Sequence, residues 1–260
     1  MTYENILFDV TDGVATITLN RNDTRNALSW AMANDISAAL DRLSGARVLV
    51  ITGAGKGFCS GGDMSAAVPE GLGFGDMLYN GLTAAVNPML AKLHELDIPV
   101  IAAVNGAAAG AGAPLALSAD FVIAANSAFF YFAFPNVGLA LDAGASWLMP
   151  RLVGLARASE ALMLAERIPA AKAAEWGMIH KAVADDDLAR ETRTLAQRLA
   201  AGPTRSFALI RHALQSGAEG TYAAALANEA KAQAIAGNSA DCAEAVAAFL
   251  EKRPPQFRGK

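Results

Sequence analysis

Short apolar strands that alternate with helical patterns constrain the fold of this chain more than any other feature of its sequence. Residues 48–52, 99–104 and 121–125 are almost wholly apolar, as strands buried on both faces are. Helical patterns separate them, and the first begins at Ser29, its predicted N-cap. Because parallel strands need crossover connections, this alternation predicts an α/β fold with a largely parallel sheet and right-handed crossovers.

The two ends of the chain depart from this alternation. Residues 6–10 and 14–19 alternate in polarity and are joined by an Asp-Gly pair, which predicts an antiparallel hairpin. At the other end only helical patterns remain. The sequence therefore predicts an α/β core over residues 1–187 and a helical C-terminal region over residues 188–260.

Composition excludes several function classes. With 260 residues, of which 53% are hydrophobic, the chain can bury a sizeable core in one domain. Its net charge of −4 is too small to favour nucleic acid or an anionic membrane surface as a partner. Cys59 and Cys242 do not make a disulfide framework, which suits a reducing cytoplasm. The uncharged segment 98–119 is long enough to cross a membrane, but its prolines and glycines predict a strand, a turn and a helix.

Two glycine-rich loops follow buried strands and are the candidate places for chemistry. They are GAGKGFCSGGD, residues 53–63, and NGAAAGAG, residues 105–112. Open α/β sheets bind ligands at the carboxyl ends of their strands, and loops with few side chains let a ligand approach backbone N–H groups. The second loop also leads into a helix, whose N-terminus favours negative charge. Two such loops side by side could direct two N–H donors at one developing oxyanion.

These loops also have simpler interpretations. Glycine-rich segments after strands are often only tight turns. A phosphate-binding loop requires Gly-Lys-Ser/Thr, whereas Lys56 is followed by Gly57, and the spacing is not that of a dinucleotide-binding Gly-x-Gly-x-x-Gly. The chain also lacks the Gly-x-Ser-x-Gly motif of serine hydrolases and any His/Cys/Asp group at metal-binding spacing.

Four motifs together resemble the crotonase, or enoyl-CoA hydratase/isomerase, superfamily over nearly the whole chain. They are LNRNDTRNALS from residue 19, TGAGKGFCSGGD from residue 52, PVIAAVNGAAAGAGAPLALSAD from residue 99 and AERIPAAKAAEWGMIHKAV from residue 165. The resemblance implies the crotonase (ClpP-like) fold of repeated ββα units. It also implies an acyl-CoA thioester as substrate, no cofactor other than the coenzyme A that the substrate carries, and no metal ion. The implied assembly is a homotrimer or a dimer of trimers, in which the C-terminal helical region packs against neighbours.

The resemblance assigns roles to individual residues. Gly62 and Ala111 fall at the two backbone donors of the family's oxyanion hole. The RNAL segment, residues 25–28, resembles the coenzyme A clamp, in which the backbone near Ala27 would meet the adenine and Arg25 a phosphate. An ordinary solvated arginine is the alternative for Arg25. The other positions expected at the substrate are Leu28, Ser60, Gly61, Asp63, Met64, Gly110 and Phe134.

The two positions at which hydratases of this family carry glutamates have no carboxylate in this chain. Pro114 and Phe134 occupy them, and neither can accept a proton, so simple hydration is not expected. Asp142 lies instead where dienoyl-CoA isomerases and 4-chlorobenzoyl-CoA dehalogenases carry a catalytic aspartate. Dehalogenases also rely on a histidine and a tryptophan, and here Asn87 and Phe134 occupy those positions.

Within the family, the chain most resembles the 1,2-epoxyphenylacetyl-CoA isomerases of phenylacetate catabolism. The shared features are an Asn-Pro pair at residue 87, an Ala-Gly-Ala-Gly-Ala run, an aspartate at residue 142 before a glycine-rich helix start, and the C-terminus over residues 239–260. The related Δ3-to-Δ2 isomerisation of enoyl-CoA in fatty-acid metabolism can use the same single carboxylate.

Asp142 is therefore expected to be the only acid and base of an isomerase. Its apolar neighbours Leu141 and Ala143 should raise its pKa by desolvation, as suits a general base near neutral pH. The alternatives are that Asp142 only caps the following helix, that the chain is an enoyl-CoA hydratase, or that it binds acyl-CoA without catalysis. Residues 66–82 are expected to line the acyl pocket, and Cys59 to pack in its loop rather than to react.

Overall fold

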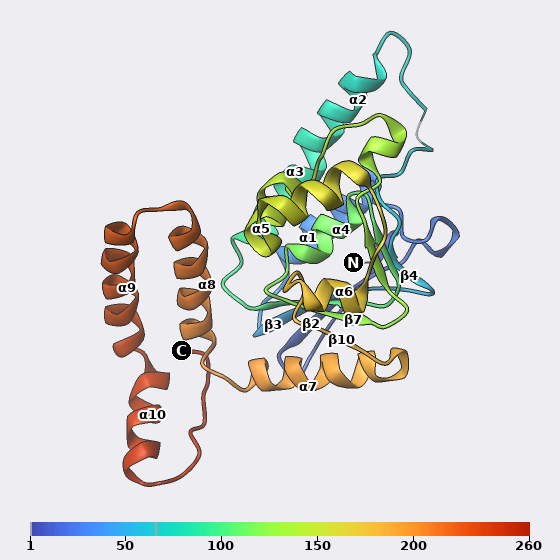
Figure 1. The fold of residues 1–260 in the computed structure, drawn as a ribbon. Coiled ribbons are helices and arrows are strands. Elements are labelled where there is room, and N and C mark those ends of the chain that lie inside the picture. Colours follow the sequence, from blue (N-terminus) through green and yellow to red (C-terminus); the bar gives the residue numbers. More distant parts are fainter. Residues whose placement is uncertain (1, 66) are drawn as a thin grey trace.

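The computed structural model describes residues 2–65 and 67–260, and its core is built on two sheets (Figure 1). The larger sheet has the strand order β1-β2-β3-β5-β7-β10. β1 and β2 form the predicted antiparallel hairpin, and the other neighbouring pairs of this sheet are parallel, which confirms the α/β fold. The strands are β1 (Ile6–Thr11), β2 (Val14–Leu19), β3 (Val48–Gly53), β5 (Val100–Val104), β7 (Phe121–Ala125) and β10 (Lys181–Val183).

A second, smaller sheet contains short strands that the sequence patterns did not predict. Its order is β4-β6-β8-β9, and β4 and β6 lie inside the two segments predicted as a loop and a turn. Strands of two or three residues are too short to show an alternation of polarity. The bounds are β4 (Gly57–Cys59), β6 (Ala107–Ala109), β8 (Phe129–Tyr131) and β9 (Ile168–Pro169). Each candidate loop is therefore braced by a strand, and the glycines after that strand hold a fixed position.

Helices cover both faces of the larger sheet (Figure 1). α1 (Trp30–Leu40) packs against β1 and β2, and α7 (Leu188–Ala200) crosses the opposite face against β3, β5 and β7. Ser29 caps α1 as predicted, because its Oγ accepts a hydrogen bond from Met32 N at 3.1 Å. The remaining core helices are α2 (Phe74–Gly81), α3 (Asn87–His94), α4 (Gly112–Leu117), α5 (Ala145–Leu164) and α6 (Ala170–Glu175).

One helical run joins α2 to α3 above the candidate loops. The π-helical turn Leu82–Val86 connects them, so the helix predicted to end near residue 96 is continuous but changes its pitch. Residue 66, the first of the segment expected to line the acyl pocket, lies outside the described residues.

Three C-terminal helices project from the core as an arm (Figure 1). They are α8 (Thr204–Glu219), α9 (Tyr222–Gly237) and α10 (Ala240–Leu250). Because α7 packs on the sheet, the projecting part begins at α8 rather than at residue 188. α9 buries none of its residues, and the arm exposes several large apolar side chains. These are Ile210, Leu214, Tyr222, Leu226, Ile235, Val246, Phe249 and Leu250. That this region packs against other copies of the chain stays a prediction.

A buried arginine joins the arm to the core. Arg211 of α8 is 5% exposed, and its Nε donates to the Asp120 carboxylate at 2.8 and 2.9 Å. Its other nitrogens donate to the carbonyl oxygens of Leu93, His94 and Leu96 at the end of α3. All of the guanidinium contacts therefore cross from α8 to the core.

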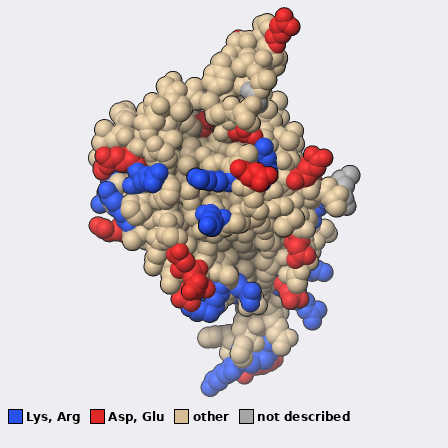
Figure 2. Space-filling model, turned by 90° about the vertical axis from the view of Figure 1, so that its right-hand side faces the viewer, with Lys and Arg blue, Asp and Glu red and all other residues tan. Residues whose placement is uncertain are grey.

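Charged side chains are interspersed on the face shown in Figure 2, in keeping with the small net charge. Within residues 2–65 and 67–260, no helix combines the length and the apolar character that a membrane crossing requires. The uncharged segment 98–119 contains β5, β6 and α4, so the expected strand and helix are present and the expected turn contains the short strand β6.

Candidate active site

Gly62 has a backbone N–H that points away from its neighbouring strand. Leu28 N donates to Gly61 O at 2.7 Å, and Asp63 N donates to Leu28 O at 3.0 Å, which makes an isolated parallel bridge between Leu28 and Gly62. Because successive backbone groups of an extended segment alternate in direction, the Gly62 N–H faces the opposite side. A Cβ atom built on Gly62 would meet nothing within 4 Å, so open space adjoins this residue.

Ala111 supplies the second predicted donor, at the start of α4. Its φ of −60° and ψ of −20° are ordinary right-handed values, so an alanine fits this position without strain. Gly110 before it has a φ of +47° and donates through its N–H to Tyr131 O at 2.8 Å. Among the hydrogen bonds of the described residues, none uses the N–H of Gly62 or Ala111 as a donor. Both groups therefore lack an acceptor among the described residues, and Ala111 is 3% exposed.

The two loops lie against each other, and glycines at the contact favour this close approach. A Cβ atom on Gly61 would lie 3.1 Å from Ala109 O, and Gly61 also has a φ of +110°. A Cβ atom on Gly110 would lie 3.3 Å from Gly61 Cα and 4.0 Å from Gly62 N. The expectation that the two glycine-rich loops are side by side is thus confirmed, and the interpretation of two separate tight turns is insufficient.

The loop of residues 25–28 turns through two consecutive left-handed residues, Arg25 (φ 53°) and Asn26 (φ 59°). Asn26 is fully buried, and its Nδ2 donates to Ala54 O at 3.0 Å and to Gly57 O at 2.9 Å. The Arg25 side chain is exposed, which is compatible both with a phosphate contact and with a solvated arginine. Asn26 was missed as a site residue, although asparagine is one of the few residues that tolerate the left-handed conformation.

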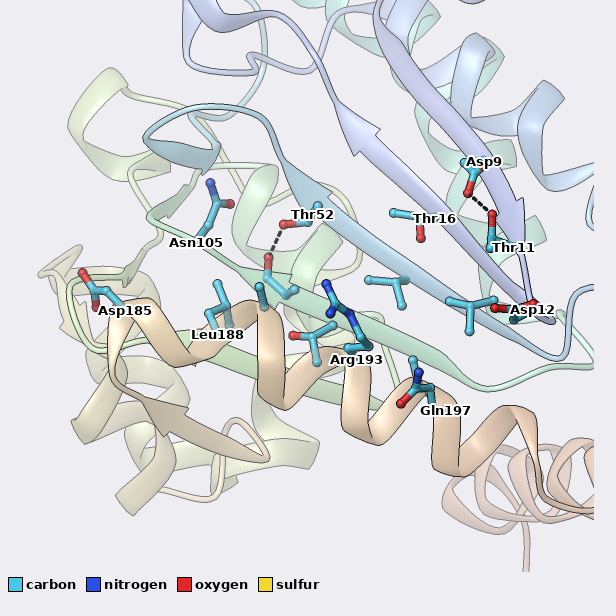
Figure 3. A pocket seen from close by; sticks show the side chains of 16 residues that line it. Asp9, Thr11, Asp12, Thr16, Thr52, Asn105, Asp185, Leu188, Arg193 and Gln197 are labelled. Atoms are coloured by element: carbon cyan, nitrogen blue, oxygen red, sulfur yellow. Dashed lines mark hydrogen bonds between the residues drawn. The ribbon is translucent and has the colours of Figure 1, made fainter.

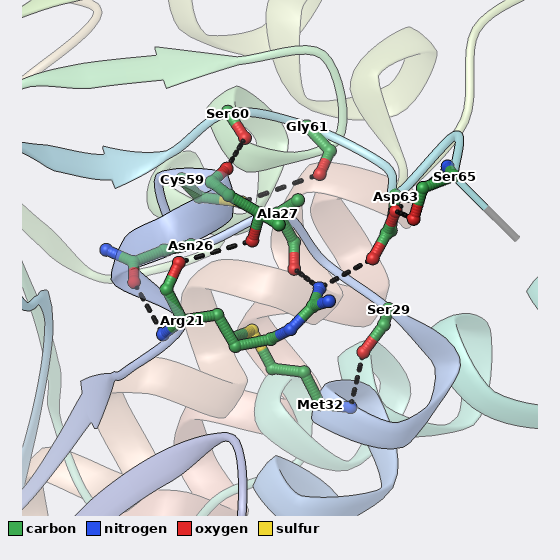
Figure 4. Close-up of polar contacts among 11 residues, drawn as sticks. Arg21, Asn26, Ala27, Ser29, Met32, Cys59, Ser60, Gly61, Asp63 and Ser65 are labelled. Atoms are coloured by element: carbon green, nitrogen blue, oxygen red, sulfur yellow. Dashed lines mark hydrogen bonds and ion pairs between the residues drawn. The ribbon is translucent and has the colours of Figure 1, made fainter.

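Asp63 is engaged inside the site rather than free to meet a ligand. Its Oδ2 lies 2.7 Å from Arg21 Nη1, and its Oδ1 accepts from the Ser65 hydroxyl at 2.6 Å (Figure 4). The hydrogen bonds from Ser65, together with Arg21, lower the pKa of the Asp63 carboxyl. Arg21 also donates to Ala27 O at 2.7 Å, a contact that the sequence did not reveal.

The other predicted substrate positions differ in exposure. Leu28 and Phe134 are buried and Met64 is 54% exposed, while Ser60 Oγ donates to Thr24 O at 2.8 Å. Pro114 is buried in α4, so the positions of the two hydratase glutamates present only Pro114 and the ring of Phe134.

Asp142 carries a carboxyl with a buried oxygen, Oδ1, that lacks a hydrogen-bond partner. Burial raises the pKa of Asp142 to about 6. The N-cap of α5 is Gly144, without any side-chain cap bond, so the interpretation of Asp142 as a helix cap is wrong. Ala143 and Gly144 have φ values of 51° and 81°, and the left-handed alanine is a strained conformation of the kind that functional sites retain.

Cys59 is packed, not poised to react. It is fully buried in β4, burial raises the pKa of its thiol to about 11, and its Sγ lies 4.0 Å from Gly61 O. We expect a disulfide-exchange reagent at pH 8 to modify only Cys242 in the folded protein and both cysteines after denaturation, because only the thiolate attacks. Peptide mass spectrometry would identify the labelled cysteine, and rapid native labelling of Cys59 would contradict this packing.

A separate cavity of about 560 Å³ lies between α7 and the strands β1, β2, β3 and β5 (Figure 3). Leu188, Arg193 and Gln197 of α7 line one wall, and Asp9 and Thr16 lie on the other. None of the predicted site residues is among its described lining residues, so this cavity is distinct from the candidate active site.

Comparison with known proteins places these features in a family context. A family model described as enoyl-CoA hydratase/isomerase matches residues 9–260. A probable enoyl-CoA hydratase of Rhodobacter capsulatus is 47% identical, with 100% of both chains covered. A 1,2-epoxyphenylacetyl-CoA isomerase of Escherichia coli is 44% identical over 99% of each chain. Among solved structures, an enoyl-CoA hydratase from Bacillus anthracis has a TM-score of 0.92 and 30% identity, covering 99% of this chain and 100% of that one.

Proposed function

Because the chain belongs to the enoyl-CoA hydratase/isomerase family, as its motifs predicted, we propose that it is an acyl-CoA isomerase with one carboxylate, Asp142, as acid and base. The observation that carries the proposal is the Asp142 carboxyl, whose buried Oδ1 has no partner and whose pKa is about 6. Such a group is ionised at neutral pH and has a free lone pair for a substrate proton.

The proposed reaction uses the backbone donors and the carboxylate together. The thioester carbonyl oxygen accepts hydrogen bonds from the N–H groups of Gly62 and Ala111. Asp142 removes a proton from C2 of a 3-enoyl thioester, and the electron pair of that bond moves toward the carbonyl, whose oxygen becomes negative. The dienolate takes the proton back at C4, so the double bond moves from C3–C4 to C2–C3. A single oxyanion-hole donor contributes about 10²–10³-fold to rates of this general kind.

Substrate binding follows the same assignment. Ala27 is proposed to meet the adenine of coenzyme A through its backbone, and Arg25 a phosphate. No metal ion or further cofactor is needed for a proton shift of this kind. The exposed apolar side chains of α8 to α10 support assembly into a homotrimer or a dimer of trimers.

Ring 1,2-epoxides of phenylacetyl-CoA are the second substrate class that we propose. The Escherichia coli relative with that name supports it, since it is 44% identical over 99% of each chain. The same two N–H donors could hold the thioester oxygen while the epoxide rearranges to the oxepin.

Hydration is the alternative, and the name of the Rhodobacter capsulatus relative favours it. It would require another group to activate water, because Pro114 and Phe134 carry no carboxylate. The test is to incubate the protein with a 3-enoyl-CoA and, separately, with a 2-enoyl-CoA, and to follow the absorbance of the conjugated thioester. We expect absorbance to rise in the first and to stay constant in the second. A fall in the second, with no rise in the first, would establish hydration instead.

The rate is expected to depend on pH through Asp142. Since the carboxylate is the reactive form and its pKa is raised to about 6, kcat/KM should fall about tenfold per pH unit below that value and be constant above it. Initial rates between pH 4.5 and 8.5 test this, with far-ultraviolet circular dichroism showing that the protein stays folded. A profile that is flat down to pH 5 would exclude Asp142 as the titrating base.

A further inference from the structure

Arg21 connects two loops of the proposed site through one nitrogen (Figure 4). Its Nη1 donates to Ala27 O at 2.7 Å and lies 2.7 Å from Asp63 Oδ2. Ala27 belongs to the loop proposed to hold coenzyme A, and Asp63 directly follows the proposed oxyanion donor Gly62. One guanidinium group therefore contacts both the loop proposed to bind the nucleotide part of coenzyme A and the loop proposed to polarise the thioester carbonyl.

The far end of this connection is itself held firmly. Asp63 Oδ1 accepts from the Ser65 hydroxyl at 2.6 Å and from Ser65 N at 3.0 Å. The Asp63 N–H donates to Leu28 O at 3.0 Å, next in the chain to Ala27. The backbone on the carboxyl side of Gly62 is thus fixed by a side-chain contact and a main-chain contact, and both lead back to the coenzyme A loop.

We propose that Arg21 is a positioning residue that keeps the Gly62 N–H and the coenzyme A loop in one relative placement. The inference rests on the proposed function, because it gives those two loops their roles. Arg21 acts through Ala27 and Asp63 rather than on the reacting atoms. Through Arg21, the binding of coenzyme A and the polarisation of the thioester carbonyl depend on each other.

The shielding of this ion pair distinguishes it from the pairs at the surface. The side chains of Arg21 and Asp63 are 24% and 11% exposed, whereas those of Lys92 and Asp41 are 34% and 65% exposed. Exposed pairs contribute little because solvent screens them. A shielded pair that fixes a catalytic donor matters more, since a misplacement of about 1 Å can cost on the order of 10²-fold in rate.

Two ligands that cannot be isomerised test the proposal by titration calorimetry. Butyryl-CoA carries the thioester carbonyl, while S-butyl-CoA is a thioether that lacks its oxygen. The Kd of S-butyl-CoA reports the coenzyme A loop, and the ratio of the two Kd values reports the oxyanion hole. Two hydrogen bonds should favour the thioester by roughly tenfold in the parent protein.

Arg21→Ala is expected to raise the Kd of S-butyl-CoA about fivefold. It should also reduce the ratio of the two Kd values, which measures the preference for the thioester, by a factor of about three or more. Arg21→Lys should recover part of both losses, because a single ammonium nitrogen can replace Nη1 in both contacts. The double variant Arg21→Ala/Asp63→Asn should show no larger change in either Kd than the single variant that binds more weakly, since the two side chains act as one unit.

An unchanged preference in folded Arg21→Ala would overturn the proposal, as would losses that simply add in the double variant. If Arg21→Ala fails to fold, Arg21→Lys and Asp63→Asn are measured instead. An unchanged preference for the thioester in both of these variants would overturn the proposal. Lys92→Ala is the matched control, because it removes the Lys92–Asp41 pair and should leave both Kd values as they are. A parent that prefers the thioester but isomerises nothing would refute the proposed reaction and leave this inference standing.

Discussion

Asp142→Asn is expected to lose roughly 10²–10⁴-fold in kcat for the isomerisation of a 3-enoyl-CoA, the usual scale for a positioned acid–base group. The amide has nearly the same shape as the carboxylate but cannot accept the C2 proton. Binding of butyryl-CoA should change little, because the two N–H donors and the coenzyme A loop are untouched. Single-turnover rates and calorimetry on the same samples measure the two effects separately. Full activity of this variant would remove Asp142 from the mechanism.

The same substitution is expected to stabilise the fold at neutral pH. The carboxyl has a pKa of about 6 in the folded protein and about 3.9 in an unfolded chain, so folding is opposed by its ionisation. This cost is absent below about pH 4, grows as pH rises toward 6 and is fully present above it. Asn should therefore raise the midpoint of urea unfolding at pH 7.5 but not at pH 4. A lower midpoint at pH 7.5 would show that the carboxylate is stabilised by its surroundings.

Arg211→Ala is expected to have the largest effect on stability, a loss of about 2 kcal/mol or more in the free energy of unfolding. Arg211 is 5% exposed, and its removal takes a donor from the Asp120 carboxylate and from three carbonyl oxygens at the end of α3. Asp120 Oδ2 keeps the Val100 N–H and His94 O keeps Gln215 Nε2, while the carbonyl oxygens of Leu93 and Leu96 lose the contact that Arg211 makes. The loss comes from several hydrogen bonds and from the packing of the buried Arg211 side chain, because the Asp120 carboxylate that remains is itself 26% exposed. Urea unfolding followed by circular dichroism measures it.

Arg253→Ala is the matched control for Arg211, because it removes an arginine ion pair that is more exposed. Arg253 is 38% exposed and pairs with Glu244 and Glu251 near the C-terminus. We expect its loss to lower the urea midpoint much less than Arg211→Ala does, because solvent screens an exposed pair. Equal costs for the two variants would mean that the arm is not held to the core by Arg211.

The long elements could be predicted because their patterns are local. The hairpin, the parallel strands β3, β5 and β7, the Ser29 cap and the four C-terminal helices follow from periodicity and capping residues, whereas the short parallel strand β10 was not predicted. β4 and β6 could not, since three small residues carry no pattern of polarity. The contacts of Arg211 were also invisible, because Asp120 lies 91 residues away in the sequence and the carbonyl groups at the end of α3 lie 115 to 118 residues away.

The candidate site was predictable where it depends on the main chain. Glycines at residues 61, 62 and 110 indicated a close approach of two loops, and the structure shows that a Cβ atom would crowd this contact at Gly61 and Gly110. Asn26 and Arg21 were missed, because their roles depend on hydrogen bonds to carbonyl groups that only the folded loops bring within reach. The environment of Asp142 was expected from its apolar neighbours, but its left-handed neighbour Ala143 was not.

The transfer of one labelled proton tests the central claim most directly. A 3-enoyl-CoA with deuterium at C2 is converted in ordinary water, and mass spectrometry measures the deuterium at C4 of the product after less than one turnover. If Asp142 alone takes the proton and returns it in a site shielded from water, a measurable fraction of the product carries that deuterium at C4, and Asp142→Asn makes almost no product. Complete loss of the label to water in the first turnover, with a fully active Asn variant, would contradict the account.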